Sequence, residues 1–137
     1  MRTVVLISCG KSKRGQRAPA HQLYTGALFQ KSLAYARHIK ADAIYILSAH
    51  YGLLDLEQEV EPYEKTLTGM TSGDIARWAK EVLVELRKRA DLANDRFVIL
   101  AGHAYRSHLI EHLTRVEVPL DRLPLGKQLR FLKLAAD

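Results

Sequence analysis

The sequence predicts an α/β domain of three layers, in which helices cover both faces of a small, mainly parallel central sheet. Residues 3–8, 43–48 and 97–101 are continuous apolar runs, a pattern typical of strands that are buried on both faces. Helical periodicity separates these runs, and a parallel pair of strands requires a crossover of this kind. A chain of 137 residues has the length of one domain, so we expect residues 1–137 to share a single core.

Four helices are expected from the spacing of the apolar residues. The first lies within residues 26–40, where its apolar positions are Leu28, Leu33, Ala36 and Ile39. The longest covers residues 71–89, where Thr71 followed by Asp74 resembles a capping box. Its apolar stripe consists of Ile75, Trp78, Val82, Leu83 and Leu86. A shorter helix is expected over residues 104–114, and a last one over residues 126–135, after two prolines.

The composition is that of a globular protein, and it argues against a membrane protein. Hydrophobic residues make up 47% and charged residues 26% of the chain, and no apolar run approaches the roughly 18 residues that a membrane span needs. The apolar start is short and lacks a small-residue cleavage site, so we interpret it as a first strand. The single cysteine, Cys9, cannot form an internal disulfide, which favours a cytoplasmic location.

The sequence predicts neither a cofactor nor a metal centre. Six histidines are present, and only His108 and His112 share the i, i+4 spacing of a ligand pair on one helix face. No cysteine pattern accompanies this pair, so we expect no metal ligand. The oligomeric state is left open.

The net charge of +6 favours a polyanionic partner, since cationic side chains neutralise phosphates. The charge is unevenly distributed along the chain. Two acid-free basic stretches carry Lys11, Lys13, Arg14 and Arg17, and Arg122, Lys127, Arg130 and Lys133. Between them lie Asp55, Glu57, Glu59, Glu61 and Glu64. A solvated basic surface that serves solubility alone is the alternative.

Three unusual loops follow the three predicted strands. They are "SCGKSKRG" at residues 8–15, "SAHYGLLDLEQEVEPYEKTL" at residues 48–67, and "AGHAYRSH" at residues 101–108. In open parallel sheets, ligands bind beyond the carboxyl ends of the strands, where loops and helix amino termini converge. The second loop is long and costly to order, so we expect it to form a wall of a site.

The first loop predicts an anion-binding turn. Ser8 and its small neighbours let the backbone approach a ligand, and Lys11 supplies a positive charge. The spacing does not fit a Walker A sequence. The alternative is a tight turn with a solvated lysine.

The second loop carries side chains suited to a planar ring. Ser48, His50 and Tyr51 come at the end of the strand, and Tyr63 follows a proline, so these groups can hydrogen-bond or stack on a base. Glu61 and Asp55 are candidates for acid–base catalysis or for stabilising a cation. Simple packing of the aromatic residues and surface exposure of the acids are the alternatives.

The third loop places His103, Tyr105 and Arg106 around the amino terminus of a helix, which favours negative charge. Arg106 can pair with a phosphate there. His103 can donate a hydrogen bond to a leaving base as that base acquires charge. A capping role for His103 is the alternative.

Together, "SCGKSK", "ILSAHYGLL" followed by "EPYEKTL", and "LAGHAYRS" resemble the three blocks of the YaaA peroxide-stress family and of a related short family of unknown function from bacteria and phages. The middle block is the specific part of the likeness. The resemblance implies a fold like that of the uracil-DNA glycosylase superfamily and recognition of a base or nucleotide. It places His103 where those glycosylases hold their base-polarising histidine. No aspartate follows the first strand to orient water, and no helix-hairpin-helix segment is evident.

These observations leave three hypotheses. The first is a protein that acts on nucleic acid, DNA rather than RNA, and admits a flipped or modified base, with cleavage of the N-glycosidic bond as the possible reaction. In it, Lys11 and Arg106 hold phosphate, Tyr51 and Tyr63 frame the ring, His103 polarises the base, and Glu61 or Asp55 supports the sugar cation or water. The second is a non-catalytic module that binds DNA or protects it from oxidative damage. The third is a nucleoside or nucleotide hydrolase.

Overall fold

A computed structural model describes residues 1–136 and shows a mixed α/β protein built on a five-stranded sheet. The strand order is β4-β3-β1-β6-β7, and all neighbours are parallel except β4, which runs antiparallel to β3. The strands are β1 (Thr3–Ser8), β3 (Ala43–Ser48), β4 (Gly52–Asp55), β6 (Arg96–Leu100) and β7 (Arg115–Glu117). The expectation of a mainly parallel sheet with the three apolar runs at its centre is confirmed.

The register brings the carboxyl ends of the central strands to one edge of the sheet. Ser8 lies opposite Leu47, and Ile7 lies opposite Leu100. A further backbone bond joins the amide of Cys9 to the carbonyl of Leu47 at 3.2 Å, so the ladder continues just past β1. The loops that follow β1, β3 and β6 therefore begin at the same edge, hereafter the carboxyl edge.

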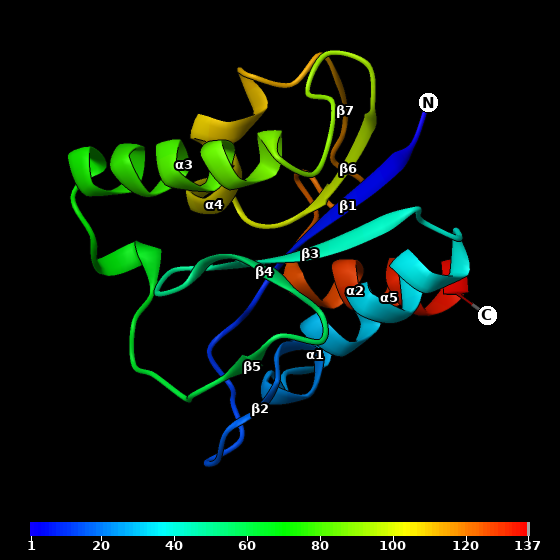
Figure 1. Ribbon diagram of the computed structural model, residues 1–137. Helices are drawn as coiled ribbons and strands as arrows, with labels where there is room; N and C mark the ends of the chain where they lie inside the picture. Colours follow the sequence, from blue (N-terminus) through cyan, green and yellow to red (C-terminus); the bar gives the residue numbers. More distant parts are fainter. Residues whose placement is uncertain (137) are drawn as a thin grey trace.

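Helices pack against both faces of the sheet (Figure 1). On one face lie α2 (Ala27–His38) and α5 (Leu125–Ala136), and on the other lie α3 (Ser72–Arg87) and α4 (His103–Ile110). Strand side chains alternate between these faces. The first core contains Val5, Ile7, Ile46, Val98 and Leu100 with Phe29, Leu33 and Leu132. The second contains Val4, Leu6, Leu47, Phe97 and Ile99 with Trp78, Val82 and Leu109.

All four expected helices are present, with ends within a few residues of the predicted ones. The capping prediction for α3 is confirmed, because the Thr71 hydroxyl accepts a hydrogen bond from the amide of Asp74 at 3.1 Å. On the buried side of α3, the Trp78 indole donates to the carbonyl oxygen of Ser48 at 2.8 Å. That bond ties α3 to the end of β3 at the carboxyl edge.

The long second loop is in part a strand, which the sequence reading missed. Residues Gly52–Asp55 form β4, and Gly52 adopts a φ of +78°, a left-handed conformation that favours glycine. Leu53 packs in the core on the α3 side, and Leu54 packs in the core on the α2 side. Two consecutive leucines are both buried because a strand sends neighbouring side chains to opposite faces.

A small lobe sits beyond the carboxyl edge. It contains a two-stranded antiparallel sheet of β2 (Ala18–Pro19) and β5 (Glu59–Val60), and the short helix α1 (Ala20–Leu23), which directly follows β2. The 3-10 helix η1 (Leu67–Gly69) then leads toward α3. Figure 1 shows this lobe to one side of the main sheet, where residues 10–25 and 56–63 lie beside each other.

Candidate functional site

A cluster of hydroxyl and thiol groups lies just beyond the carboxyl edge. It is formed by Cys9, Tyr24, Ser48, Tyr63 and Tyr105 and is called the phenol cluster below. The Tyr63 hydroxyl lies 2.7 Å from the hydroxyls of both Tyr24 and Ser48, and 3.5 Å from the Cys9 sulfur. The Tyr105 hydroxyl lies 3.8 Å from the same sulfur. The cluster therefore joins the chain segments after β1, β3 and β6 and the lobe.

The direction of the hydrogen bonds follows from counting donors and acceptors. Ser48 Oγ accepts from the amides of His50, at 3.2 Å, and Tyr51, at 3.0 Å. Its two lone pairs are then engaged, so the Ser48 hydroxyl donates to Tyr63 Oη. Tyr63 donates to Cys9 Sγ, and because a phenol has one proton, Tyr63 accepts from Tyr24. The protons of the cluster thus point toward the Cys9 sulfur.

Burial keeps the phenols protonated. It raises the pKa of Tyr24 to about 12, since an ionised phenolate loses solvation inside the protein. Burial, followed by the nearby Cys9, likewise raises the pKa of Tyr63 and of Tyr105 above the ordinary value. At neutral pH all three groups are hydrogen-bond donors, as the arrangement requires.

An aromatic platform, made of His50, Tyr51 and Tyr63, covers the cluster. The His50 ring stacks on Tyr63 with centroids 5.0 Å apart and an interplanar angle of 26°, and its edge meets Tyr51 at 4.6 Å. The Tyr51 hydroxyl donates to the carbonyl of Glu61 at 3.0 Å and accepts from its amide at 3.1 Å. These contacts fix the turn after β3 against residues 61–63, while His50 stays exposed to solvent.

The first basic loop lies beside this platform. Its backbone is tied to the lobe through a bridge between Lys13 and Tyr24 and a 2.8 Å bond from the amide of Arg14 to the carbonyl of Leu23. The Lys13 ammonium lies 4.5 Å from the centroid of the Tyr63 ring, a cation–π contact, and donates to the carbonyl of Lys11 at 3.0 Å. The side chain of Lys11 is exposed. The Lys13 ammonium is thus near the carboxyl edge, and the Lys11 backbone lies beside it.

The third segment divides between the cluster and the surface. Tyr105 joins the phenol cluster, and its ring meets Trp78 edge-on at 5.6 Å. His103 is the exposed first residue of α4. The Arg106 guanidinium donates to the carbonyl of Ala101 and to the carboxylate of Asp121, both at 2.9 Å. Arg106 is thus engaged with groups of the protein itself, whereas the sequence predicts that it pairs with a phosphate.

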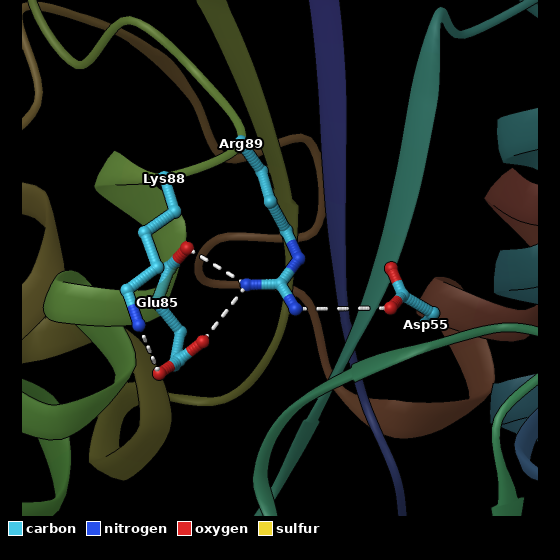
Figure 2. Close-up of polar contacts among 4 residues, drawn as sticks. All are labelled: Asp55, Glu85, Lys88 and Arg89. Atoms are coloured by element: carbon cyan, nitrogen blue, oxygen red, sulfur yellow. Dashed lines mark hydrogen bonds and ion pairs between the residues drawn. The ribbon is translucent and has the colours of Figure 1, made fainter.

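The two acidic candidates lie in different places. Asp55 is at the far end of β4, opposite Tyr45 in the register, about 10 Å from the carboxyl edge. Its carboxylate lies 3.8 Å from the guanidinium of Arg89, which also binds Glu85 (Figure 2). The structure therefore does not bring Asp55 to the site. Glu61 is beside the platform, and its carboxylate lies 3.7 Å from the guanidinium of Arg17.

Candidate residues line two different cavities. His50 and Tyr51 line an open hollow of about 420 Å³ between the turn after β3 and α3, and neither Lys11 nor His103 is among its lining residues. Ser8 and Arg106 line a separate space of about 40 Å³. Within residues 1–136 no group of three or more histidine, cysteine or acidic side chains is arranged to hold a metal ion. No helix in the same residues is long and apolar enough to cross a membrane.

Three members of the site escaped the sequence reading. The sequence suggests no binding role for Cys9 or Tyr24, and for Trp78 it indicates only a core position in a helix. Two of them carried a usable signal. Cys9 directly follows a strand that ends at the carboxyl edge, and Trp78 is a tryptophan whose N–H needs a partner once it is buried. Tyr24 gave no local signal, because its contact with Tyr63 spans 39 residues.

Comparisons with known proteins give a family but no activity. A model of a family of unknown function, DUF6884, matches residues 4–134. No curated protein and no solved structure matches the chain. The match covers nearly the whole chain, including all three segments at the carboxyl edge. The protein therefore belongs to the DUF6884 family of unknown function.

Proposed function

We propose that the protein recognises a base-bearing ligand, a nucleic acid or a nucleotide, at the aromatic platform. The observation that carries this proposal is the His50 ring, which is exposed and yet held in place by its stack on Tyr63 and its edge contact with Tyr51. A rigid, solvent-facing ring gives a base a stacking surface at little cost in conformational entropy.

The electrostatic surroundings support the same ligand class. Lys13 lies over Tyr63, Lys11 and Arg14 are exposed on the same loop, and the chain carries a net charge of +6. Ammonium and guanidinium groups beside a stacking surface suit a base that is attached to a phosphate. Arg106 has no part in this proposal, because its guanidinium is engaged with Asp121.

We also propose that the domain has three layers and that it resembles the YaaA family and the uracil-DNA glycosylase fold. Both points are supported by the two helical pairs that cover opposite faces of the sheet and by the position of His103 directly after β6. Cleavage of an N-glycosidic bond would add water to the sugar C1′ and release the base. The exposed imidazole of His103 would donate a hydrogen bond to the leaving base, and Glu61, beside the platform, would accept the proton of the water. Asp55 is omitted because it pairs with Arg89 away from the carboxyl edge.

Binding is tested by fluorescence anisotropy with labelled single- and double-stranded DNA and RNA, and by thermal shift with free nucleotides. We expect His50→Ala to weaken binding about tenfold, the usual range for loss of one stacking contact. The matched control is His38→Ala, since His38 is exposed in the last turn of α2, at the opposite edge of the sheet. Equal binding by the His50 and His38 variants, or no binding by the unmodified protein, contradicts the proposal.

Cleavage is tested separately with oligonucleotides that carry varied modified bases, followed by alkali to break the strand at abasic sites. We expect strand breaks with at least one base and a strong loss of product in His103→Ala, with binding retained. The matched control is His112→Ala, because His112 is also exposed and follows the same helix. Absence of breaks across the panel removes the reaction from the proposal and leaves recognition alone.

A further inference from the structure

The open hollow beside the platform has a composition that the proposed function does not use. Its walls are the turn after β3, the segment before η1 and the exposed side of α3. Its volume of about 420 Å³ lies in the range of pockets that bind small molecules. The aromatic residues that line it are His50, Tyr51 and Trp78, and the first two also belong to the platform. A base stacked on His50 therefore has this hollow next to it.

The charged side chains that line the hollow are Lys65, Asp74, Arg77 and Glu81. Asp74 and Arg77 neutralise each other through an ion pair within one turn of α3. Among the side chains that the structure describes, Lys65 and Glu81 have no ion-pair partner within 4.0 Å. The hollow thus offers one ammonium and one carboxylate that are exposed to solvent and free of ion pairs among the described residues.

We propose that this hollow binds a nucleotide whose base carries an exocyclic amino group, with Glu81 accepting from the amino group and Lys65 pairing with the phosphate. The proposal rests on the proposed function, because it places the base against His50. It adds the identity of the base class and two further binding residues.

The preference follows from the chemistry of a carboxylate. An ionised glutamate only accepts hydrogen bonds, so it pairs with the amino groups of guanine, adenine and cytosine and repels a carbonyl oxygen at the same position. Uracil presents a carbonyl where cytosine has its amino group, and hypoxanthine presents a bare carbon where guanine has its amino group. Lys65 complements the opposite end of the ligand, since an ammonium is a point charge suited to phosphate. A negative phosphate and a donating amino group are thus matched by the two unpaired charges.

The experiment uses two pairs of nucleotides that differ chiefly at the amino position. Affinities of the intact chain for GMP and IMP, and for CMP and UMP, are measured by isothermal titration calorimetry. We expect the amino-bearing member of each pair to bind about tenfold more tightly, the discrimination that one good base contact provides. Glu81→Gln is expected to reduce this preference to about twofold or less, because an amide both donates and accepts.

Matched controls separate specific effects from a change in net charge. Glu111→Gln removes an exposed carboxylate near the end of α4 and is expected to keep the full preference. Lys65→Ala is expected to weaken nucleotide binding while leaving nucleoside binding nearly unchanged, and Lys133→Ala, on α5, is expected to do neither.

Equal affinities within both pairs, or a preference that survives Glu81→Gln, overturn the inference. The proposed function still stands in that case if nucleotides or oligonucleotides bind and His50→Ala weakens their binding. No binding of any nucleotide or oligonucleotide by the intact chain overturns both. A preference that is lost in Glu81→Gln and kept in Glu111→Gln supports the inference.

Discussion

The hydroxyls of Ser48 and Tyr63 lie 2.7 Å apart, and this contact connects the end of a buried strand to the lobe. On one side, Ser48 Oγ accepts from the amides of His50 and Tyr51 and so shapes the turn after β3. On the other side, the Tyr63 ring supports the imidazole of His50. The same residue pair therefore fixes both the backbone and the ring of the exposed histidine.

Tyr63→Phe is the most direct test of this arrangement. The change keeps the ring and removes the hydroxyl, so Ser48 and Tyr24 lose their common partner in a buried place. We expect the free energy of unfolding to fall by about 1–3 kcal/mol, the usual cost of unpaired buried polar groups, as measured by urea denaturation.

The matched control is Tyr35→Phe, on α2. The Tyr35 ring is half-buried and contacts Phe131 with centroids 5.9 Å apart, and this packing survives the change. We expect its unfolding free energy to stay within about 0.5 kcal/mol of the unmodified value. Equal losses in the two variants would show that the hydroxyl of Tyr63 has no special role.

The buried phenols predict a loss of stability in alkali. Tyrosines in the unfolded chain ionise near pH 10, whereas the pKa of Tyr24 in the folded protein is about 12. Between these values the unfolded chain has released protons that the folded protein retains, so the free energy of unfolding falls as pH rises. The stabilising contribution is complete below pH 10 and decreases above it, by at most about 1.4 kcal/mol per pH unit for each tyrosine.

The measurement is urea denaturation at several pH values from 9 to 12, with Tyr24→Phe as the comparison. We expect the variant to be less stable at pH 9 and to lose stability less steeply than the unmodified protein above pH 10. Parallel curves for the two proteins would mean that Tyr24 ionises equally in both states, against the burial seen in the structure.

Cys9 is expected to be protected from thiol reagents in the folded protein. The residue is 1% exposed, and its sulfur lies among the hydroxyls of Tyr63 and Tyr105. A bulky disulfide reagent therefore has no access without opening of the cluster. We expect negligible reaction under native conditions and complete reaction of one thiol in concentrated urea.

A control with an accessible thiol gives the scale for this reaction. Ser12→Cys in a Cys9→Ala background places the thiol on the exposed basic loop, where we expect rapid reaction in the folded state. Native reaction of Cys9 at a comparable rate would show that the cluster opens readily.

The main elements of the fold were predictable because their signals are local. The continuous apolar runs of β1, β3 and β6 and the apolar stripe of α3 each lie within one segment. The strand β4 was missed because Leu53 and Leu54 are buried on opposite faces, and so short a run shows no alternation. β7, with three residues, has too little sequence to stand out.

The candidate site was predictable mainly where its residues follow a strand, and Tyr63, which follows Pro62 in the long loop, was predicted as well. Ser48, His50 and Tyr51 were placed at the carboxyl edge correctly, since the end of a buried strand determines their position. The partners of Arg106 and Asp55 were not predictable, because Asp121 and Arg89 come from separate elements brought together by the tertiary fold. A charged side chain near a predicted site is therefore weak evidence until its ion-pair partners are known.

Asp55→Asn tests the reassignment of this residue from catalysis to a surface ion pair. The carboxylate is half exposed and lies 3.8 Å from Arg89, which keeps its contacts with Glu85 when Asp55 is changed (Figure 2). We expect a loss of less than about 1 kcal/mol in unfolding free energy, as for other exposed ion pairs. Ligand binding should be unchanged in the anisotropy assay, because the side chain lies about 10 Å from the carboxyl edge.

The matched comparison is Glu61→Gln, beside the platform, where any acidic contribution to binding or cleavage is expected to appear. A larger functional defect in Asp55→Asn than in Glu61→Gln would restore Asp55 as a site residue and require β4 to move when ligand binds.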